Sequence, residues 1–200
     1  LQNNLHTASK NPDYDLREIF TETLVGSRPD KAVTVVDNHD TQPLQALEAP
    51  VDTWFKPIAY ALILLRNDGY PCVFYFFFYG ASYKDHGKDG KEYEIVLEKV
   101  DAIEALLKAR KDYAYGEQQD YFDDAHCIGW VRKGDKEHGG CAVVLSNKDK
   151  NHKSMEMGKI YAGKTFFDFT GHLQDKIVAD KNGRADFPCP AGNVSVWVAE

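Results

Sequence analysis

The pattern of apolar and polar residues divides the chain near residue 113. In the first part, apolar side chains recur at helical spacing over three segments, residues 13–23, 54–65 and 95–109. Two short apolar runs without charge, residues 32–36 and 72–75, lie between these segments. Such runs are typical of strands buried on both faces of a parallel sheet. The order helix, strand, helix, strand, helix therefore predicts βα units, and we expect further strands to precede Leu1 because two cannot form a stable parallel sheet.

From residue 113 onward the pattern is that of short strands separated by turns. Seven strands are predicted, at residues 127–132, 141–146, 153–157, 165–169, 176–180, 184–187 and 194–199. Glycine-rich turn signals such as Gly139-Gly140 and Asn182-Gly183 separate them. This part predicts an antiparallel β-sandwich, so the fold class is α/β for residues 1–112 and all-β for residues 113–200.

Composition narrows the classes of partner. The formal net charge is −7 and no run of five basic residues occurs, which argues against nucleic acid. No apolar run is long enough to cross a bilayer, so no membrane is expected. The four cysteines show neither a CxxC pair nor zinc-site spacing, and we expect buried free thiols in a reducing compartment; a disulfide framework is the alternative. Because the chain begins with Leu1 in a polar segment, a secretory signal on a longer polypeptide stays open.

The residues with candidate chemistry follow the first predicted strand directly. Asp37, Asn38, His39, Asp40 and Gln42 stand together where that strand ends. In barrels, catalytic side chains lie at the carboxyl ends of strands. Carboxylates beside an imidazole can bind sugar hydroxyls and stabilise the positive charge of an oxocarbenium-like transition state. The same residues are equally typical of a polar turn whose side chains cap backbone amides, and the pattern alone favours neither interpretation.

A resemblance to a known family favours the first interpretation. The string Val36-Asp37-Asn38-His39-Asp40-Thr41-Gln42-Pro43 resembles the last signature region of the α-amylase family, glycoside hydrolase family 13. The similarity continues in order through other segments, including residues 54–57, 69–75, 79–81, 109–111, 121–123, 129–130 and 194–198. It covers essentially the whole chain and is greatest with the liquefying-type branch, within it with cytoplasmic bacterial α-amylases.

The resemblance implies roles for these residues. Asp40 would be the catalytic carboxylate that stabilises the transition state, and His39, Asn38 and Gln42 would bind the substrate. Residues 1–112 would be strands seven and eight of an incomplete (β/α)₈ TIM barrel, and residues 113–200 the C-terminal β-domain. The family nucleophile and general acid, like the rest of the barrel and domain B, would precede Leu1, so this chain alone is expected to be inactive.

The implied activity is retaining endo-hydrolysis of α-1,4-glucosidic bonds in starch, glycogen or maltodextrin. The partner would be an α-glucan, the location the cytoplasm, and the full-length protein a monomer. The alternative is a non-catalytic module in which residues 113–200 bind glucan or serve only as a structural β-domain. The aromatic residues of that part motivate it: Tyr113, Tyr115, Tyr121, Trp130, Tyr161, Phe166, Phe167 and Trp197.

The sequence departs from the family pattern in two places. Phe77 stands where the family has an acidic residue, within the run Phe76-Phe77-Phe78, which we expect to pack in the core; an exposed aromatic platform is the alternative. Calcium is expected for the full-length family, with its main site in domain B. A second family site between barrel and β-domain uses two carboxylates, where this chain has His126 and Asn147. Because calcium prefers anionic oxygen ligands, no calcium is predicted within residues 1–200.

Overall fold

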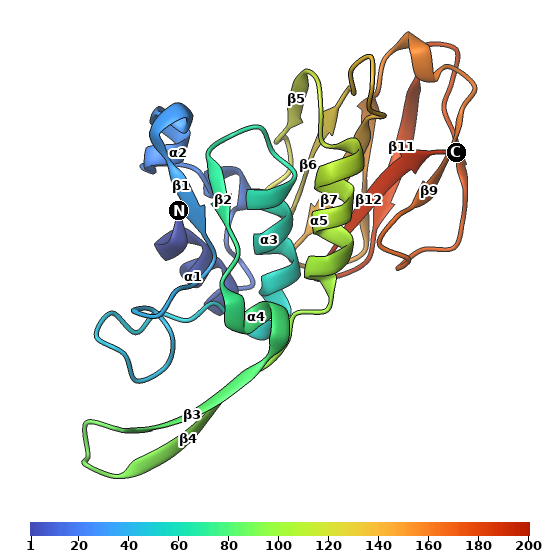
Figure 1. Ribbon diagram of the computed structural model, residues 1–200. Helices are drawn as coiled ribbons and strands as arrows, with labels where there is room; N and C mark the ends of the chain where they lie inside the picture. Colours follow the sequence, from blue (N-terminus) through green and yellow to red (C-terminus); the bar gives the residue numbers. More distant parts are fainter.

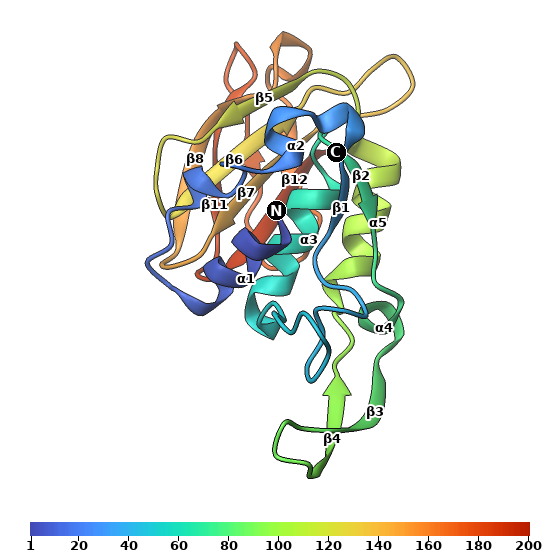
Figure 2. The ribbon, with the colours of Figure 1, turned by 90° about the vertical axis from the view of Figure 1, so that its left-hand side faces the viewer.

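The computed structural model describes all 200 residues and shows a body of helices packed on an antiparallel sheet (Figure 1). The helices of the body are α1 (Gln2–Lys10), α3 (Lys56–Leu64) and α5 (Ala102–Tyr113). Two short helices, α2 (Leu24–Ser27) and α4 (Tyr75–Tyr79), lie at its margins. A hairpin formed by β3 (Ala81–His86) and β4 (Glu92–Leu97) projects from the body as a long arm (Figures 1 and 2). No helix is both long and apolar enough to cross a lipid bilayer.

The two strands predicted in the first half are parallel neighbours. β1 (Val33–Val35) pairs with β2 (Tyr70–Cys72), with Val33 opposite Tyr70 and Val35 opposite Cys72. The second strand therefore begins two residues earlier than predicted. The prediction that these strands are buried on both faces is wrong. The sheet has only these two strands, and Val33 is 67% and Tyr70 75% exposed.

The second half is the predicted antiparallel β-sandwich. The larger sheet has the order β10-β9-β12-β7-β6-β5. Its strands are β5 (Gln118–Tyr121), β6 (Cys127–Arg132), β7 (Cys141–Ser146), β9 (Thr165–Asp168), β10 (Ile177–Val178) and β12 (Asn193–Ala199). The smaller sheet pairs β8 (Asn151–Glu156) with β11 (Arg184–Cys189). It packs on β6, β7 and β12, whereas α3 packs on the other face of the larger sheet.

The central strands are apolar throughout because both faces of the larger sheet are covered. In β7, Val143 and Leu145 face one apolar cluster, and Ala142 and Val144 face another. The first cluster contains 30 buried residues and includes most of α3 and the buried face of α5. The second cluster fills the space between the two sheets. The helical half and the β half therefore share one continuous core.

One predicted helix is wrong, and another begins later than predicted. Residues 13–23 contain only a 3₁₀ turn, Leu16–Glu18, in which the Asp15 carboxylate accepts from the Arg17 amide, and the Leu16 amide bonds across to the Ala125 carbonyl. The regular helix of this region, α1, comes earlier. Residues 92–97 are strand β4, so the helix predicted from residue 95 begins at Ala102. In both places tertiary pairing overrides an apolar spacing that also fits a helix.

Candidate functional site

The candidate site is a loop that leaves the carboxyl end of β1 and returns to the body at Val51. Asp37, the second residue after β1, is almost fully buried at its base. Its carboxylate accepts hydrogen bonds from the Val51 amide at 3.1 Å, from the Gln2 side chain at 3.2 Å and from the Thr41 hydroxyl at 3.3 Å. Asp37 therefore fastens the two ends of the loop to each other and to α1.

Burial changes the acidity of Asp37. Removal from water disfavours the charged carboxylate and raises its pKa from 3.8 to about 6. The donors from Val51, Gln2 and Thr41, together with the Lys56 ammonium nearby, oppose this shift. The buried Lys56 also lies 3.7 Å above the Phe77 ring. Asp37 is thus a structural carboxylate whose burial costs free energy when it ionises.

Asn38 and Gln42 belong to the framework of the loop. The Asn38 side-chain oxygen accepts from the Asp40 amide at 3.0 Å and from the Thr41 amide at 3.1 Å, which closes a tight turn. Gln42 is buried, and its side-chain oxygen has no hydrogen-bond partner within the chain. Asp37 and Asn38 therefore cap backbone amides, as the polar-turn interpretation of this string predicted.

His39 and Asp40 project from this turn into solvent. Their side chains are 79% and 47% exposed, and the His39 Nε2 lies 3.5 Å from the Asp40 Oδ1. The turn made by Asn38 thus presents an imidazole and a carboxylate side by side. Such a pair can donate to and accept from sugar hydroxyls, and the carboxylate can stabilise positive charge developing on a bound ring.

The β3–β4 hairpin meets the far side of the same loop, a contact that the sequence did not predict. The Tyr83 hydroxyl donates to the Pro43 carbonyl, and the Gln45 side-chain amide donates to the Asp85 carboxylate at 2.9 Å. A groove of about 380 Å³ lies between loop and hairpin. Its lining includes Leu44, Gln45, Glu48, His86, Asp89 and Tyr93. No local signal announces these contacts, because the partners lie about 40 positions apart.

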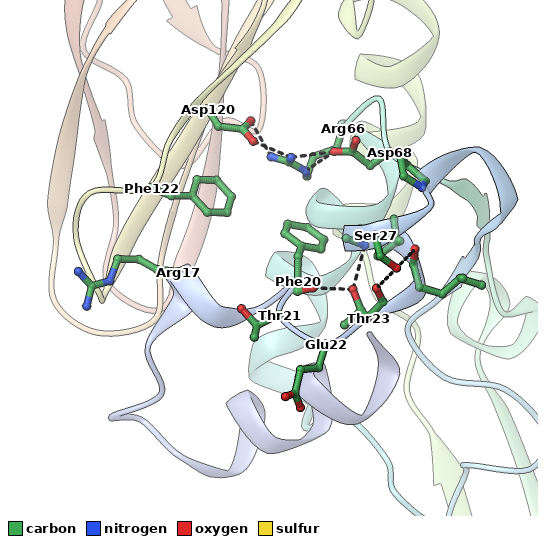
Figure 3. Close-up of a pocket in the computed structure, with 14 residues that line it drawn as sticks. Arg17, Phe20, Thr21, Glu22, Thr23, Ser27, Arg66, Asp68, Asp120 and Phe122 are labelled. Carbon is green, nitrogen blue, oxygen red and sulfur yellow. Dashed lines mark hydrogen bonds and ion pairs between the residues drawn. The ribbon is translucent and has the colours of Figure 1, made fainter.

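A larger groove, about 820 Å³, lies elsewhere (Figure 3). Most of its lining residues precede β1 or β2, and Asp120 and Phe122 come from the region of β5. The groove therefore opens at the amino ends of β1 and β2, whereas the candidate site follows their carboxyl ends. Its Arg66 guanidinium is buried and bonds to the Asp68 and Asp120 carboxylates (Figure 3). It also lies over the rings of Phe20 and Phe122. The charges of Arg66, Asp68 and Asp120 are thus paired with one another. We therefore interpret this groove as the place where the two halves of the chain pack together, and not as a ligand site.

The junction where the family resemblance implies a second calcium does not fit a cation. The His126 Nδ1 and the Asn147 Oδ1 are 3.1 Å apart in a hydrogen bond. The Asn147 amide donates to the Tyr14 carbonyl at 2.8 Å. The Asn147 side-chain N–H therefore faces the Tyr14 carbonyl oxygen, and neither His126 nor Asn147 supplies an anionic ligand. The chain also assembles no group of three His, Cys, Asp or Glu side chains suited to a metal ion. The prediction of no calcium within residues 1–200 stays a prediction.

Most aromatic residues are part of the core. Phe77 in α4 is buried, whereas Tyr75 and Tyr79 on the same helix are exposed. Among the aromatic residues proposed for glucan binding by the β half, Trp130, Phe166 and Trp197 are fully buried. The interior position of these rings favours a structural role.

The cysteines are unpaired. All four are free thiols, and Cys127, Cys141 and Cys189 are buried as predicted. Burial raises the pKa of the Cys127 thiol to about 11. Cys72 is exposed, contrary to prediction, because it lies on the uncovered β2 strand.

Comparison with known proteins identifies the class of protein to which part of the chain is similar. The profile of the α-amylase C-terminal domain matches residues 141–198. The fold also resembles solved structures: an Anoxybacillus α-amylase (TM-score 0.66, 16% identity, 99% of this chain and 45% of that chain) and a γ-CGTase from alkalophilic Bacillus clarkii (TM-score 0.61, 21% identity, 96% and 30%). These likenesses show the fold alone.

Sequence relatives are more specific. The chain is 51% identical over 201 residues to the cytoplasmic α-amylase of Escherichia coli K12, covering 100% of this chain and 41% of the relative. It is 45% identical to the α-amylase of Geobacillus stearothermophilus, covering 99% and 35%. The chain therefore belongs to the α-amylase family, and it spans about two fifths of the length of these relatives.

Proposed function

We propose that this chain contributes Asp40 and His39 to the active site of an α-amylase that hydrolyses internal α-1,4-glucosidic bonds of starch, glycogen or maltodextrin with retention. The observation that carries the proposal is the exposed His39–Asp40 pair, held just beyond a parallel strand in a chain 51% identical to an α-amylase. The α-glucan is the partner, and the cytoplasmic location of the E. coli relative supports the same location here.

In this proposal Asp40 stabilises the positive charge that develops on the sugar ring, and His39 hydrogen-bonds sugar hydroxyls at the same place. Asn38 supports them through the turn that it closes, and Gln42, whose side-chain oxygen has no hydrogen-bond partner in the chain, is the further substrate-binding residue of this proposal. The nucleophile and the general acid come from residues other than 1–200. We therefore expect no glucan hydrolysis by this chain alone.

The same proposal gives each half a place in the whole enzyme. Residues 1–112 supply strands seven and eight of a (β/α)₈ barrel, and residues 113–200 the C-terminal β-domain. The parallel pair β1–β2 with its uncovered face supports the first assignment, and the match over residues 141–198 supports the second. The full-length enzyme is proposed to be a monomer, with the family's main calcium site in domain B.

The test is a chimera in which residues 1–200 replace the matching segment of the E. coli α-amylase. We expect the chimera to hydrolyse starch, and Asp40→Asn to lower kcat by about 10²-fold or more, because it removes an electrostatic group that acts on the transition state. Asp101→Asn is the matched control, since the Asp101 side chain, just before α5, is 94% exposed and pairs only with Lys99 at 3.8 Å. Activity of the Asp40→Asn chimera equal to that of the control would remove Asp40 from the mechanism.

A further inference from the structure

The loop that carries Asp40 is held at its base and along its length. The Asp37 carboxylate joins the ends of the loop through the Val51 amide. Within the loop, the Leu47 amide donates to the Asp40 carbonyl at 3.1 Å, and the Ala49 amide donates to the Thr41 carbonyl at 2.9 Å. At the turn that contains Leu44, one bond of the loop itself, from the Gln45 backbone amide to the Gln42 carbonyl at 3.2 Å, closes the chain.

That turn contains backbone strain. Leu44 has φ of +64°, a left-handed conformation that is costly for a residue with a bulky side chain. Such a conformation persists only where the surroundings hold it. The two residues that flank Leu44 are also bonded to the hairpin: the Pro43 carbonyl accepts from the Tyr83 hydroxyl, and the Gln45 side-chain amide donates to the Asp85 carboxylate.

The hairpin is suited to hold the loop because it is itself well paired. Six consecutive residue pairs join β3 to β4, from Ala81 with Leu97 to His86 with Glu92. At its base Leu97 is buried, and the Tyr83 ring packs against the main apolar cluster. Both bonds to the loop come from residues of β3 that face the same side, two positions apart.

From these contacts we infer that Tyr83 and Asp85 are positioning residues: the hairpin fastens the strained turn at Leu44 and so fixes where the Asp40 carboxylate points. The consequence for catalysis rests on the proposed function, whereas the fastening itself does not.

The fastening is tested in the 200-residue chain by amide hydrogen exchange. In the double variant Tyr83→Phe/Asp85→Ala, we expect the Leu47 and Ala49 amides to exchange about tenfold faster, because two hydrogen bonds that hold the loop are lost. The NMR signals of the His39 ring, which lies 3.5 Å from Asp40, are expected to shift. Tyr93→Phe is the control, since the Tyr93 hydroxyl bonds only to Asp89 in the hairpin's own turn, at 2.8 Å.

A conservative variant distinguishes the effect of the Gln45–Asp85 hydrogen bond from the effect of removing the Asp85 side chain. Asp85→Asn keeps an acceptor oxygen for Gln45, so exchange is expected to stay near the wild-type rate, unlike that of Asp85→Ala. Unchanged exchange in the double variant, or equal acceleration by Tyr93→Phe, overturns the inference. In the chimera, the double variant is expected to lower kcat about tenfold, with KM and melting temperature little changed. If the chimera proves independent of Asp40, the proposed function fails while the exchange result still stands.

Discussion

Asp37 and Asp40 stand three positions apart in one loop and have opposite environments. Asp37 is buried with three hydrogen-bond donors, whereas Asp40 is half exposed and touches only His39 through its side chain. Proximity in sequence therefore says little about the role of a carboxylate. The first shapes the loop, and the second is available to a ligand.

The raised pKa of Asp37 makes the stability of the fold depend on pH. Because its pKa is 3.8 in the unfolded chain and about 6 in the folded one, the folded state binds more protons in this window. The favourable contribution is complete below pH 3.8 and is lost as the pH rises through 6. We expect the stability of Asp37→Asn relative to that of the wild type to rise over this range, by up to about 3 kcal/mol between low pH and pH 7.

Urea unfolding of both proteins at pH 4.5 and pH 7 measures this difference. The fully solvated Asp101→Asn serves as the reference, for which we expect the same difference from wild type at both pH values. A difference between Asp37→Asn and wild type that stays constant with pH would contradict the assignment of burial as the cause.

At the scale of elements, the end of α3 is the point where helix, loop and sheet are joined. Arg66, two residues after α3, bonds to Asp68 before β2 and to Asp120 in β5. Its guanidinium also lies 5.4 Å from the Trp130 ring of β6. One buried cation thus connects the βα half to the edge of the large sheet.

Replacing this guanidinium tests the joint. A lysine keeps the charge but cannot bond to two carboxylates in a planar, bidentate way, so we expect Arg66→Lys to lower the free energy of unfolding by about 2–4 kcal/mol. Chemical denaturation measures the loss. Arg184→Lys, in a half-exposed pair with Glu156 at 3.5 Å, is expected to change it by less than about 1 kcal/mol. Equal effects of the two variants would show that Arg66 contributes as an ordinary surface residue.

The elements that the sequence predicted well are those whose environment is uniform. Strands β6 and β7 have the predicted bounds because every residue in them is buried and turns flank them. The hairpin was missed because residues 95–97 also fit the apolar spacing of the following helix. Strand β5 was missed because Gln118–Tyr121 is polar and lies at the edge of the sheet, where pairing with β6 alone forms it.

The candidate site divides in the same way. Residues 38–42 were recognised because they form a continuous polar string after an apolar strand. Tyr83 and Asp85 were not, because their bonds to Pro43 and Gln45 depend on how a distant hairpin folds back. Local spacing has no information on such contacts.

At the scale of the whole molecule, the shared core predicts one unfolding transition. Leu62 of α3 belongs to the same apolar cluster as Val143 and Val196 of the large sheet. We expect Leu62→Ala to cost about 2–5 kcal/mol and to lower the stability of both halves together. Circular dichroism and tryptophan fluorescence should then give coincident melting curves in wild type and variant. Two separate transitions would show that the halves fold independently.

The junction at His126 and Asn147 allows a final prediction about the whole molecule. These side chains bond to each other, and Asn147 bonds to the Tyr14 carbonyl, so the halves are joined there by hydrogen bonds. We expect the melting temperature of the wild type to be the same in calcium and in EDTA. In His126→Asp/Asn147→Asp, two carboxylates would replace the amide and the imidazole and face a free carbonyl, the ligands that calcium prefers.

That double variant is expected to be less stable than wild type in EDTA, because the new carboxylates add to the charge of Asp13 and Asp15 beside the junction. Millimolar calcium should restore several degrees of melting temperature to it, since an ion that binds only the folded state stabilises that state by mass action. Magnesium is the control, because it demands a smaller octahedral site. A wild type that already gains stability from calcium would show that the hydrogen-bonded junction opens to accept an ion.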